Sequence, residues 1–167
     1  GDVGSGKTIV AVLATAIVIS HGSQVAVMAP TEILAEQHYQ SFTKLCQPSG
    51  IRIEILTGNL KKEERKKIYR DLEFGEIHLI VGTHALIQED VNFRDLGMII
   101  IDEQHRFGVQ QRKALIDKGS FPEVLALTAT PIPRTLAFTI HGDMEISLID
   151  ELPKNRLPII TKAIKPS

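Results

Sequence analysis

Short apolar runs alternate along the chain with longer segments in which apolar residues recur at helical spacing. The short runs predict strands at residues 24–29, 51–56, 78–83, 97–102 and 123–128. The longer segments predict helices at 9–22, 31–47, 60–75 and 109–119, and the first is apolar enough to predict a buried helix. Apolar strands separated by helices indicate an α/β domain, with a mostly parallel sheet and helices on both faces.

Two of these helices have a face that we expect to pack inward. On helix 31–47 the expected inward residues are Ile33, Leu34, Tyr39, Phe42 and Leu45, and on helix 60–75 they are Leu60, Ile68 and Leu72. The charged string at 61–67 carries opposite charges at helical spacing, such as Glu63 and Lys67. This pattern is typical of a solvated helix face.

Composition narrows the class of protein. The chain has 167 residues, of which 43% are hydrophobic and 23% charged, as in an ordinary globular domain. The net charge of -1 excludes a polybasic nucleic-acid binder, so any DNA contact must come from a local surface. The single cysteine, Cys46, excludes a disulfide framework and a thiolate zinc site, and we expect it to pack near a helix end. No apolar run reaches the ~20 residues that span a membrane.

The first eight residues match G-x-x-x-x-G-K-[ST], the phosphate loop of nucleotide-binding proteins. Glycines let successive backbone N–H groups face phosphate oxygens, and the following helix presents its positive N-terminus to the same anion. We expect Lys7 to reach the β- and γ-phosphates of ATP and Thr8 to bind Mg²⁺. The predicted nucleotide-binding residues are Gly1, Asp2, Val3, Gly4, Ser5, Gly6, Lys7 and Thr8. The alternative is a glycine-rich turn before a helix, but the long apolar helix that follows favours the phosphate loop.

An acidic pair follows the apolar strand 97–102. Asp102 ends the strand and Glu103 comes next. In open α/β sheets, ligands bind at the carboxyl ends of the strands. Asp102 is therefore expected to hold Mg²⁺ through water, and Glu103 to act as the general base. The histidines His21, His38, His78 and His141 show no ligand spacing, so we expect no other metal site.

Several motifs together resemble the superfamily-two helicases. The string PTEILAEQH at 30–38 resembles their motif Ia, and DEQH at 102–105 resembles motif II, a relative of the DEAD and DEAH boxes. The string TAT at 128–130 resembles motif III, GTHA at 82–85 lies where motif Ib belongs, and Gly58 lies where a short glycine motif belongs. The resemblance covers nearly the whole chain and implies a RecA-like fold that hydrolyses ATP.

Longer strings are similar to the RecG family of bacterial branch-migrating helicases. These strings are GDVGSGKT, DEQHRFGVQQR and TATPIPRTLAFTIHGD. The transcription-repair coupling translocases share TATPIPRTL and are the nearest alternative, but Gln104-His105 and the run 109–112 favour the RecG family. That family implies ATP-driven motion on double-stranded and branched DNA in replication-fork repair and recombination. It also implies a second RecA-like domain in the same polypeptide, a monomer, and a cytoplasmic, nucleoid-associated location in a bacterium.

The resemblance also assigns roles to individual residues. Pro30, Thr31, Gly58, Thr83 and His84 become candidate DNA contacts, since small hydroxyls and exposed N–H groups suit phosphates. For Thr31 a plain helix N-cap is equally compatible with the sequence. The hydroxyls of Thr128 and Thr130 are expected to face motif II and bond His105, which would couple the phosphate state to DNA binding. Arg106 and Arg134 are surface arginines by default, and Arg134, inside TATPIPRT, is alternatively a partner of motif II or of the second domain.

The organisation that we expect is a motor domain at 1–152, cut within its phosphate loop, followed by a proline-bearing linker at 153–167. A phosphate-loop phosphotransferase, with Asp102 positioning a small acceptor, is the alternative from another class. It has no need for the PTEILAEQ and TATPIPRT strings. A motor that has lost its activity and only binds is the third, and intact Lys7 and Glu103 argue against it.

Overall fold

The computed structural model describes residues 5–129, 145–147 and 149, and within them a five-stranded parallel sheet. The strand order is β2-β3-β1-β4-β5. The strands are β1 (Gln24–Met28), β2 (Ile53–Leu56), β3 (Leu79–Gly82), β4 (Leu96–Asp102) and β5 (Glu123–Leu127). All four neighbouring pairs are parallel. Each predicted strand is confirmed, and because the strands are parallel, their carboxyl ends share one edge of the sheet.

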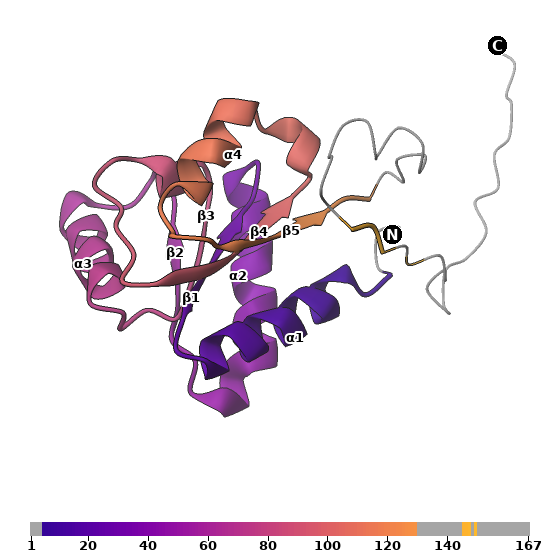
Figure 1. The fold of residues 1–167 in the computed structure, drawn as a ribbon. Coiled ribbons are helices and arrows are strands. Elements are labelled where there is room, and N and C mark those ends of the chain that lie inside the picture. The colour runs from indigo at the N-terminus through magenta and orange to yellow at the C-terminus, as the bar shows by residue number, and fades with distance from the viewer. Residues whose placement is uncertain (1–4, 130–144, 148, 150–167) are drawn as a thin grey trace, which may run out of the picture.

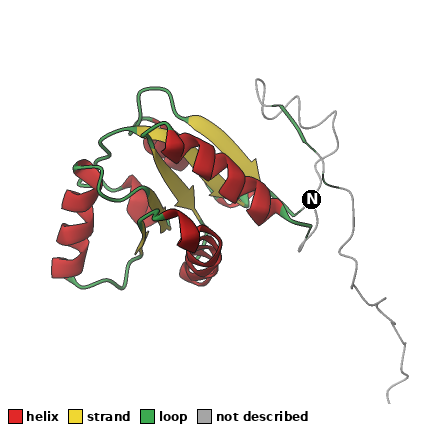
Figure 2. Cartoon of the chain, turned by 90° about the horizontal axis from the view of Figure 1, so that it is seen from below, coloured by secondary structure: helices red, strands yellow, loops and turns green. Residues whose placement is uncertain are grey.

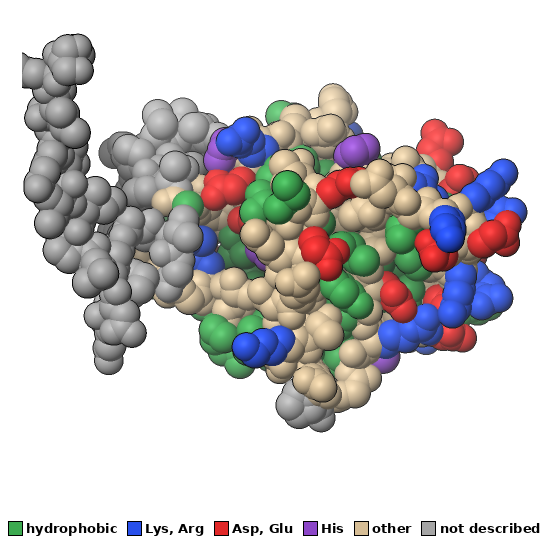
Figure 3. All heavy atoms as spheres, turned by 180° about the vertical axis from the view of Figure 1, so that it is seen from behind, with side chains coloured by type: hydrophobic (Ala, Val, Ile, Leu, Met, Phe, Trp, Pro, Cys, Tyr) green, Lys and Arg blue, Asp and Glu red, His purple; other side chains and the backbone are tan. Residues whose placement is uncertain are grey.

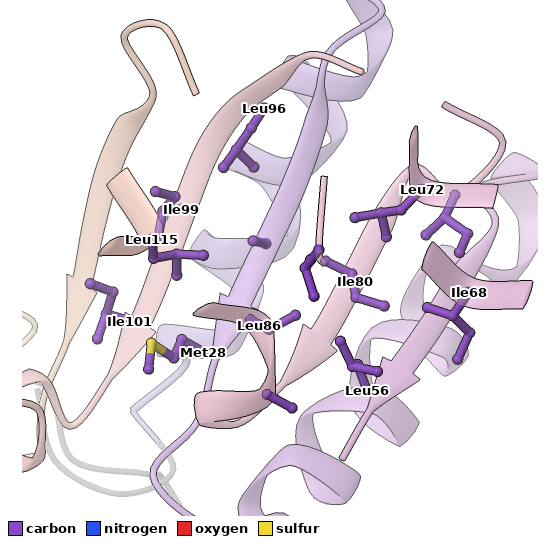
Figure 4. Packing of buried hydrophobic residues seen from close by; sticks show 14 of the residues in the cluster. Met28, Leu56, Ile68, Leu72, Ile80, Leu86, Leu96, Ile99, Ile101 and Leu115 are labelled. Atoms are coloured by element: carbon purple, nitrogen blue, oxygen red, sulfur yellow. The ribbon is translucent and has the colours of Figure 1, made fainter. Parts of the chain in front are cut away.

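Helices cover both faces of the sheet, as the sequence predicts (Figures 1 and 2). They are α1 (Lys7–Ser20), α2 (Glu32–Cys46), α3 (Lys62–Glu73) and α4 (Val109–Ile116), with short 3₁₀ helices η1 (Gln47–Ser49), η2 (His84–Ile87) and η3 (Gln104–Arg106). Buried residues of α1 and α2 share one core cluster with the sheet, and those of α3, η2 and α4 share a second. Figure 4 shows the second cluster, in which buried side chains pack over the strands between Leu115 of α4 on one side and Ile68 of α3 on the other.

Two expectations about helix faces are wrong. Helix α1 is not buried all round, since Leu13 and Ile17 are 61% and 62% exposed, and its buried residues among those described are Ala11 and Thr15. A helix lying on a sheet buries only the side that meets the strands, whatever its composition. On α2, Ile33 and Leu45 are exposed, because the buried side is set by residues four and seven apart at Ala35, Phe42 and Cys46, with Leu34 and Tyr39 partly buried.

Other expectations are confirmed. Ile68 and Leu72 of α3 are buried, and Leu60 packs against the same core just before that helix. Charged side chains gather at the end of the molecule where α3 lies (Figure 3), in accord with a solvated face. Cys46 is buried, and burial raises the pKa of its thiol. No helix in the described part of the chain is long and apolar enough to cross a membrane. The expected linker at 153–167 lies outside the described residues.

A buried glutamine joins segments at the edge of the sheet where the strands begin. Gln24, which is 2% exposed, donates from Nε2 to the carbonyl oxygens of Leu72 and Ile77. Its Oε1 accepts from the backbone N–H groups of Arg94 and Asp95. This single side chain therefore ties the end of α3 and the entry to β4 to the start of β1.

Candidate nucleotide and DNA site

The predicted functional residues lie after the carboxyl ends of the strands. The segments after β1, β2 and β3 carry the candidate DNA contacts, and those after β4 and β5 carry the acidic pair and Thr128. In Figure 1, α1 begins on the side of the molecule where β5 ends. The sheet thus places the DNA candidates, the acidic pair and Thr128 along one edge, in the strand order given above.

The described part of the phosphate loop fits an anionic ligand. Gly6 is in the left-handed region with φ of 97°, and a Cβ there would meet no heavy atom within 4 Å. Ser5 Oγ is buried and has no hydrogen-bond partner among the described residues, as expected of a group that awaits a phosphate oxygen. Lys7 and Thr8 begin α1 directly behind this turn. Gly1, Asp2, Val3 and Gly4 lie outside the described residues.

The acidic pair is placed by an unusual backbone turn at the end of β4. Asp102 is the last strand residue, and Glu103 has a φ of 48°, the left-handed region that non-glycine residues rarely adopt. The Glu103 N–H donates to Leu127 O at 2.8 Å, which joins this turn to the end of β5. Both residues of the pair are partly buried at the end of β4.

The Glu103 carboxylate is held by residues from two segments. Thr128 Oγ1 lies 3.3 Å from its Oε2, and the Ala129 N–H donates to Oε1 at 3.1 Å. His105 Nδ1 lies 3.3 Å from the same Oε2. Thr128 therefore faces motif II as expected, but the partner that it shares with His105 is Glu103. The expected second hydroxyl, Thr130, lies outside the described residues.

One contact of Asp102 is not predicted from the sequence. His38 Nε2 lies 2.8 Å from Asp102 Oδ2, and the two side chains are only 15% and 13% exposed. The sequence predicts no role for His38, because the histidines show no ligand spacing. No local signal connects two residues 64 positions apart, and only the neighbouring positions of β1 and β4 bring them together.

The described residues contain no group of three or more His, Cys, Asp or Glu side chains that could hold a metal ion by themselves. A magnesium ion that arrives with a nucleotide needs few protein ligands, because phosphate oxygens and water complete its shell. The Thr8 hydroxyl and the Asp102 carboxylate are donors of that hard-oxygen kind, so their chemistry fits Mg²⁺ brought in with ATP.

The candidate DNA contacts differ in exposure. Thr31 is exposed and caps α2, accepting from Leu34 N at 3.3 Å, which confirms the N-cap reading. Pro30 is partly buried, whereas Gly58 and His84 are exposed. Thr83 is 2% exposed, so the expectation that its hydroxyl contacts DNA is wrong for this arrangement. It points inward because it directly follows the buried strand β3.

The Gly58 turn is held from both sides. Glu32 Oε1 accepts from Gly58 N at 2.9 Å, and Glu32 Oε2 accepts from the Asn59 side chain. Arg65 Nη2 donates to the carbonyl oxygens of Thr57 at 3.2 Å and Gly58 at 3.0 Å. The turn after β2 is therefore fixed to the first turn of α2 and to α3.

Comparison with known proteins decides the family. The family model described as DEAD/DEAH box helicase matches residues 1–138. The chain belongs to the DEAD/DEAH box helicase family. Its sheet and flanking helices are the RecA-like fold of that family, which confirms the predicted fold class.

Within this helicase family the chain is similar to RecG proteins over nearly its whole length. It is 56% identical over 164 residues to the ATP-dependent DNA helicase RecG of Aquifex aeolicus, covering 97% of this chain and 21% of that protein. It is 57% identical to the RecG of Synechocystis sp., covering 98% and 20%. A solved structure of RecG bound to a three-way DNA junction is 46% identical, with a TM-score of 0.80, over 94% of this chain and 21% of that one. The chain thus spans about a fifth of the length of these relatives.

Proposed function

We propose that these residues form the first RecA-like motor domain of a RecG-type helicase, which hydrolyses ATP to move on double-stranded DNA and remodel branched DNA. The observation that supports this most is the placement of the acidic pair, the motif III segment and the motif Ia helix on one sheet edge. Helicases of the RecG type also account for identities of 51–57% over nearly the whole chain, which favours them over the transcription-repair translocases.

Bound Mg-ATP would supply the γ-phosphoryl group whose transfer to water drives the motor. In this chain Lys7 would neutralise charge at the β- and γ-phosphates, and Thr8 with Asp102 would hold Mg²⁺. The Ser5 hydroxyl, which is buried without a partner among the described residues, and the backbone at Gly6 would bind the phosphates. Glu103 takes the proton of the attacking water at its carboxylate, which the Thr128 hydroxyl and the Ala129 N–H orient.

The DNA-binding part of the proposal rests on exposed groups after β1, β2 and β3. The exposed residues Thr31, Gly58 and His84 offer a hydroxyl, an exposed glycine turn and an imidazole, which suit phosphates without reading base sequence, and the partly buried Pro30 directly precedes Thr31. We propose that a second RecA-like domain in the same polypeptide completes both the nucleotide site and the DNA track. We further propose a monomer that acts at the bacterial nucleoid in the cytoplasm.

Steady-state ATP hydrolysis by the parent polypeptide that carries this chain tests the proposal. Turnover should rise on addition of a three-way junction or other double-stranded DNA, and Lys7→Ala should reduce it by ~10² or more, because charge stabilisation worth several kcal/mol is lost. Unchanged turnover in Lys7→Ala would remove the phosphate-loop assignment. Turnover that responds to a small phosphoryl acceptor and not to DNA would instead establish the phosphotransferase alternative.

A further inference from the structure

We infer that His38 is a positioning residue that fixes the Asp102 carboxylate for Mg²⁺ and ties it to helix α2. This inference deepens the proposed function and rests on it for the identity of the metal. It is carried by the contact of His38 Nε2 with Asp102 Oδ2 at 2.8 Å, made between two largely buried side chains.

The fold leaves little freedom in this contact. Helix α2 follows β1 directly, and β1 lies beside β4 in the sheet, so the second turn of α2 is brought to the carboxyl end of β4. His38 lies three residues after Ala35 and four before Phe42, both buried against the sheet. The imidazole is therefore on the inward margin of the helix and reaches the end of the strand.

A carboxylate only accepts hydrogen bonds, so the imidazole donates from Nε2 to Oδ2. With Oδ2 engaged, the carboxylate is held in one orientation, and Oδ1 is the oxygen that would accept from a magnesium-bound water. Hydrogen bonds that orient metal-binding carboxylates typically change metal affinity or activity by 10–100-fold when they are removed.

The same helix also carries the residue that holds the candidate DNA-binding turn. Glu32, in the first turn of α2, accepts from Gly58 N. His38 follows on the same helix, less than two helical turns after Glu32. A displacement of α2 when DNA binds at Gly58 or Thr31 would move His38 with it. Helix α2 thus joins the candidate DNA contacts to the Mg²⁺ ligand by two side chains of one rigid element.

Two amide substitutions separate positioning from packing. His38→Gln places its amide nitrogen near the position of Nε2 and should keep the bond, whereas the shorter amide of His38→Asn should not reach Asp102. Gln37→Asn, at an exposed neighbouring position of α2, is the matched control for helix propensity. In the parent polypeptide, the Mg²⁺ concentration for half-maximal binding of a fluorescent ATP analogue is measured together with DNA-stimulated hydrolysis and thermal unfolding.

His38→Asn should raise the half-maximal Mg²⁺ concentration by about 10-fold and lower the DNA stimulation of hydrolysis, with little change in the unfolding midpoint. The half-maximal Mg²⁺ concentration of His38→Gln should stay within about 3-fold of that of the unmodified protein, and that of Gln37→Asn should equal the unmodified value. Equal impairment by both amides, or an unchanged Mg²⁺ dependence in His38→Asn, would overturn the inference. The binding measurement remains decisive if the parent shows no DNA-stimulated hydrolysis, a result that would refute the proposed function alone.

Discussion

Glu103 adopts the one positive φ among the non-glycine residues that the structure describes. A residue held in the left-handed region costs of order 1–3 kcal/mol, and such strain persists only where surrounding contacts determine it. Here the Glu103 N–H bonds Leu127 O, and the carboxylate meets Thr128, Ala129 and His105. The strained backbone aims this one carboxylate at the segment after β5, as expected of a catalytic group.

The division of roles within the acidic pair gives a first residue-scale prediction. Glu103→Gln keeps the size and the backbone turn but removes the proton acceptor, so Mg-ATP binding should persist while turnover falls by ~10² or more. Asp102→Asn should instead weaken nucleotide binding and raise the Mg²⁺ requirement together. Nucleotide titrations and hydrolysis rates in the parent polypeptide distinguish the two, and identical behaviour of both variants would contradict the assignment.

A second residue-scale prediction concerns Asp71, which is buried beside two arginines. The hydrogen bond from Arg52, at 2.6 Å, lowers the pKa of the Asp71 carboxyl, and Arg70 at 3.1 Å acts in the same direction against the effect of burial. A folded-state pKa below the unfolded value of about 3.9 stabilises the fold above that pH, and this contribution is lost as pH falls through the lower folded value.

Asp71→Asn should therefore lower the thermal unfolding midpoint at pH 7. The gap between variant and unmodified protein should narrow as the pH is reduced below about 4, where the aspartate becomes protonated. Unfolding midpoints measured from pH 7 to pH 3 check this, with exposed Asp90→Asn as the control. A gap that does not depend on pH would mean that Asp71 acts by shape and not by charge.

At the scale of elements, the buried side chain of Gln24 links separate segments by hydrogen bonds to their backbones. It donates to two carbonyl groups and accepts from two N–H groups that meet at the start of β1, and one of these carbonyls, that of Leu72 in α3, also accepts from Gly75 N. Buried backbone groups left without a partner each cost about 1–3 kcal/mol, so their loss is felt even when shape is preserved.

We therefore predict that Gln24→Leu, which keeps the volume but removes all four hydrogen bonds, destabilises the domain by about 3–5 kcal/mol, since local relaxation recovers part of the cost. Chemical denaturation measures the loss. The same substitution at exposed Gln40 is the control and should stay within about 0.5 kcal/mol. A small effect at Gln24 would show that water replaces the side chain.

At the scale of the whole molecule, the strand order divides the sheet edge into two regions. The candidate DNA contacts follow β2, β3 and β1, whereas the acidic pair and Thr128 follow β4 and β5. Helix α2 crosses the boundary through its contacts with Gly58 and Asp102. The site is therefore continuous along one edge, which is the arrangement that a motor needs to link DNA binding to phosphate chemistry.

From this arrangement we predict that a polypeptide limited to these 167 residues is nearly inert. In the proposed two-domain motor, an arginine from the second domain stabilises the transferring phosphate, an effect worth about 10³ or more in rate. Half of the DNA track would belong to that domain as well. Hydrolysis assays with and without branched DNA, run beside the parent polypeptide, should show negligible turnover and no stimulation. Turnover near the parent's rate would mean that one domain completes the site.

The sequence by itself determined the elements and the chemistry that each segment carries. Eight consecutive residues specify the phosphate loop, and the apolar run that ends in Asp102 specifies a strand with a carboxylate at its end. These features are local, because periodicity and turn residues act over a few positions of backbone. They were sufficient for the fold class and for the proposal that Lys7, Asp102 and Glu103 form the nucleotide site.

Only the tertiary structure decided which of those residues meet. His38 reaches Asp102, Thr128 reaches Glu103, and Thr83 turns inward. The exposed sides of α1 and α2 also differ from those that the hydrophobic pattern predicts, because a helix buries the side that the neighbouring strands cover. Such contacts depend on the strand order, which sets β1 beside β4 and β4 beside β5. That order arises from packing across the whole sheet, so no local stretch of sequence encodes it.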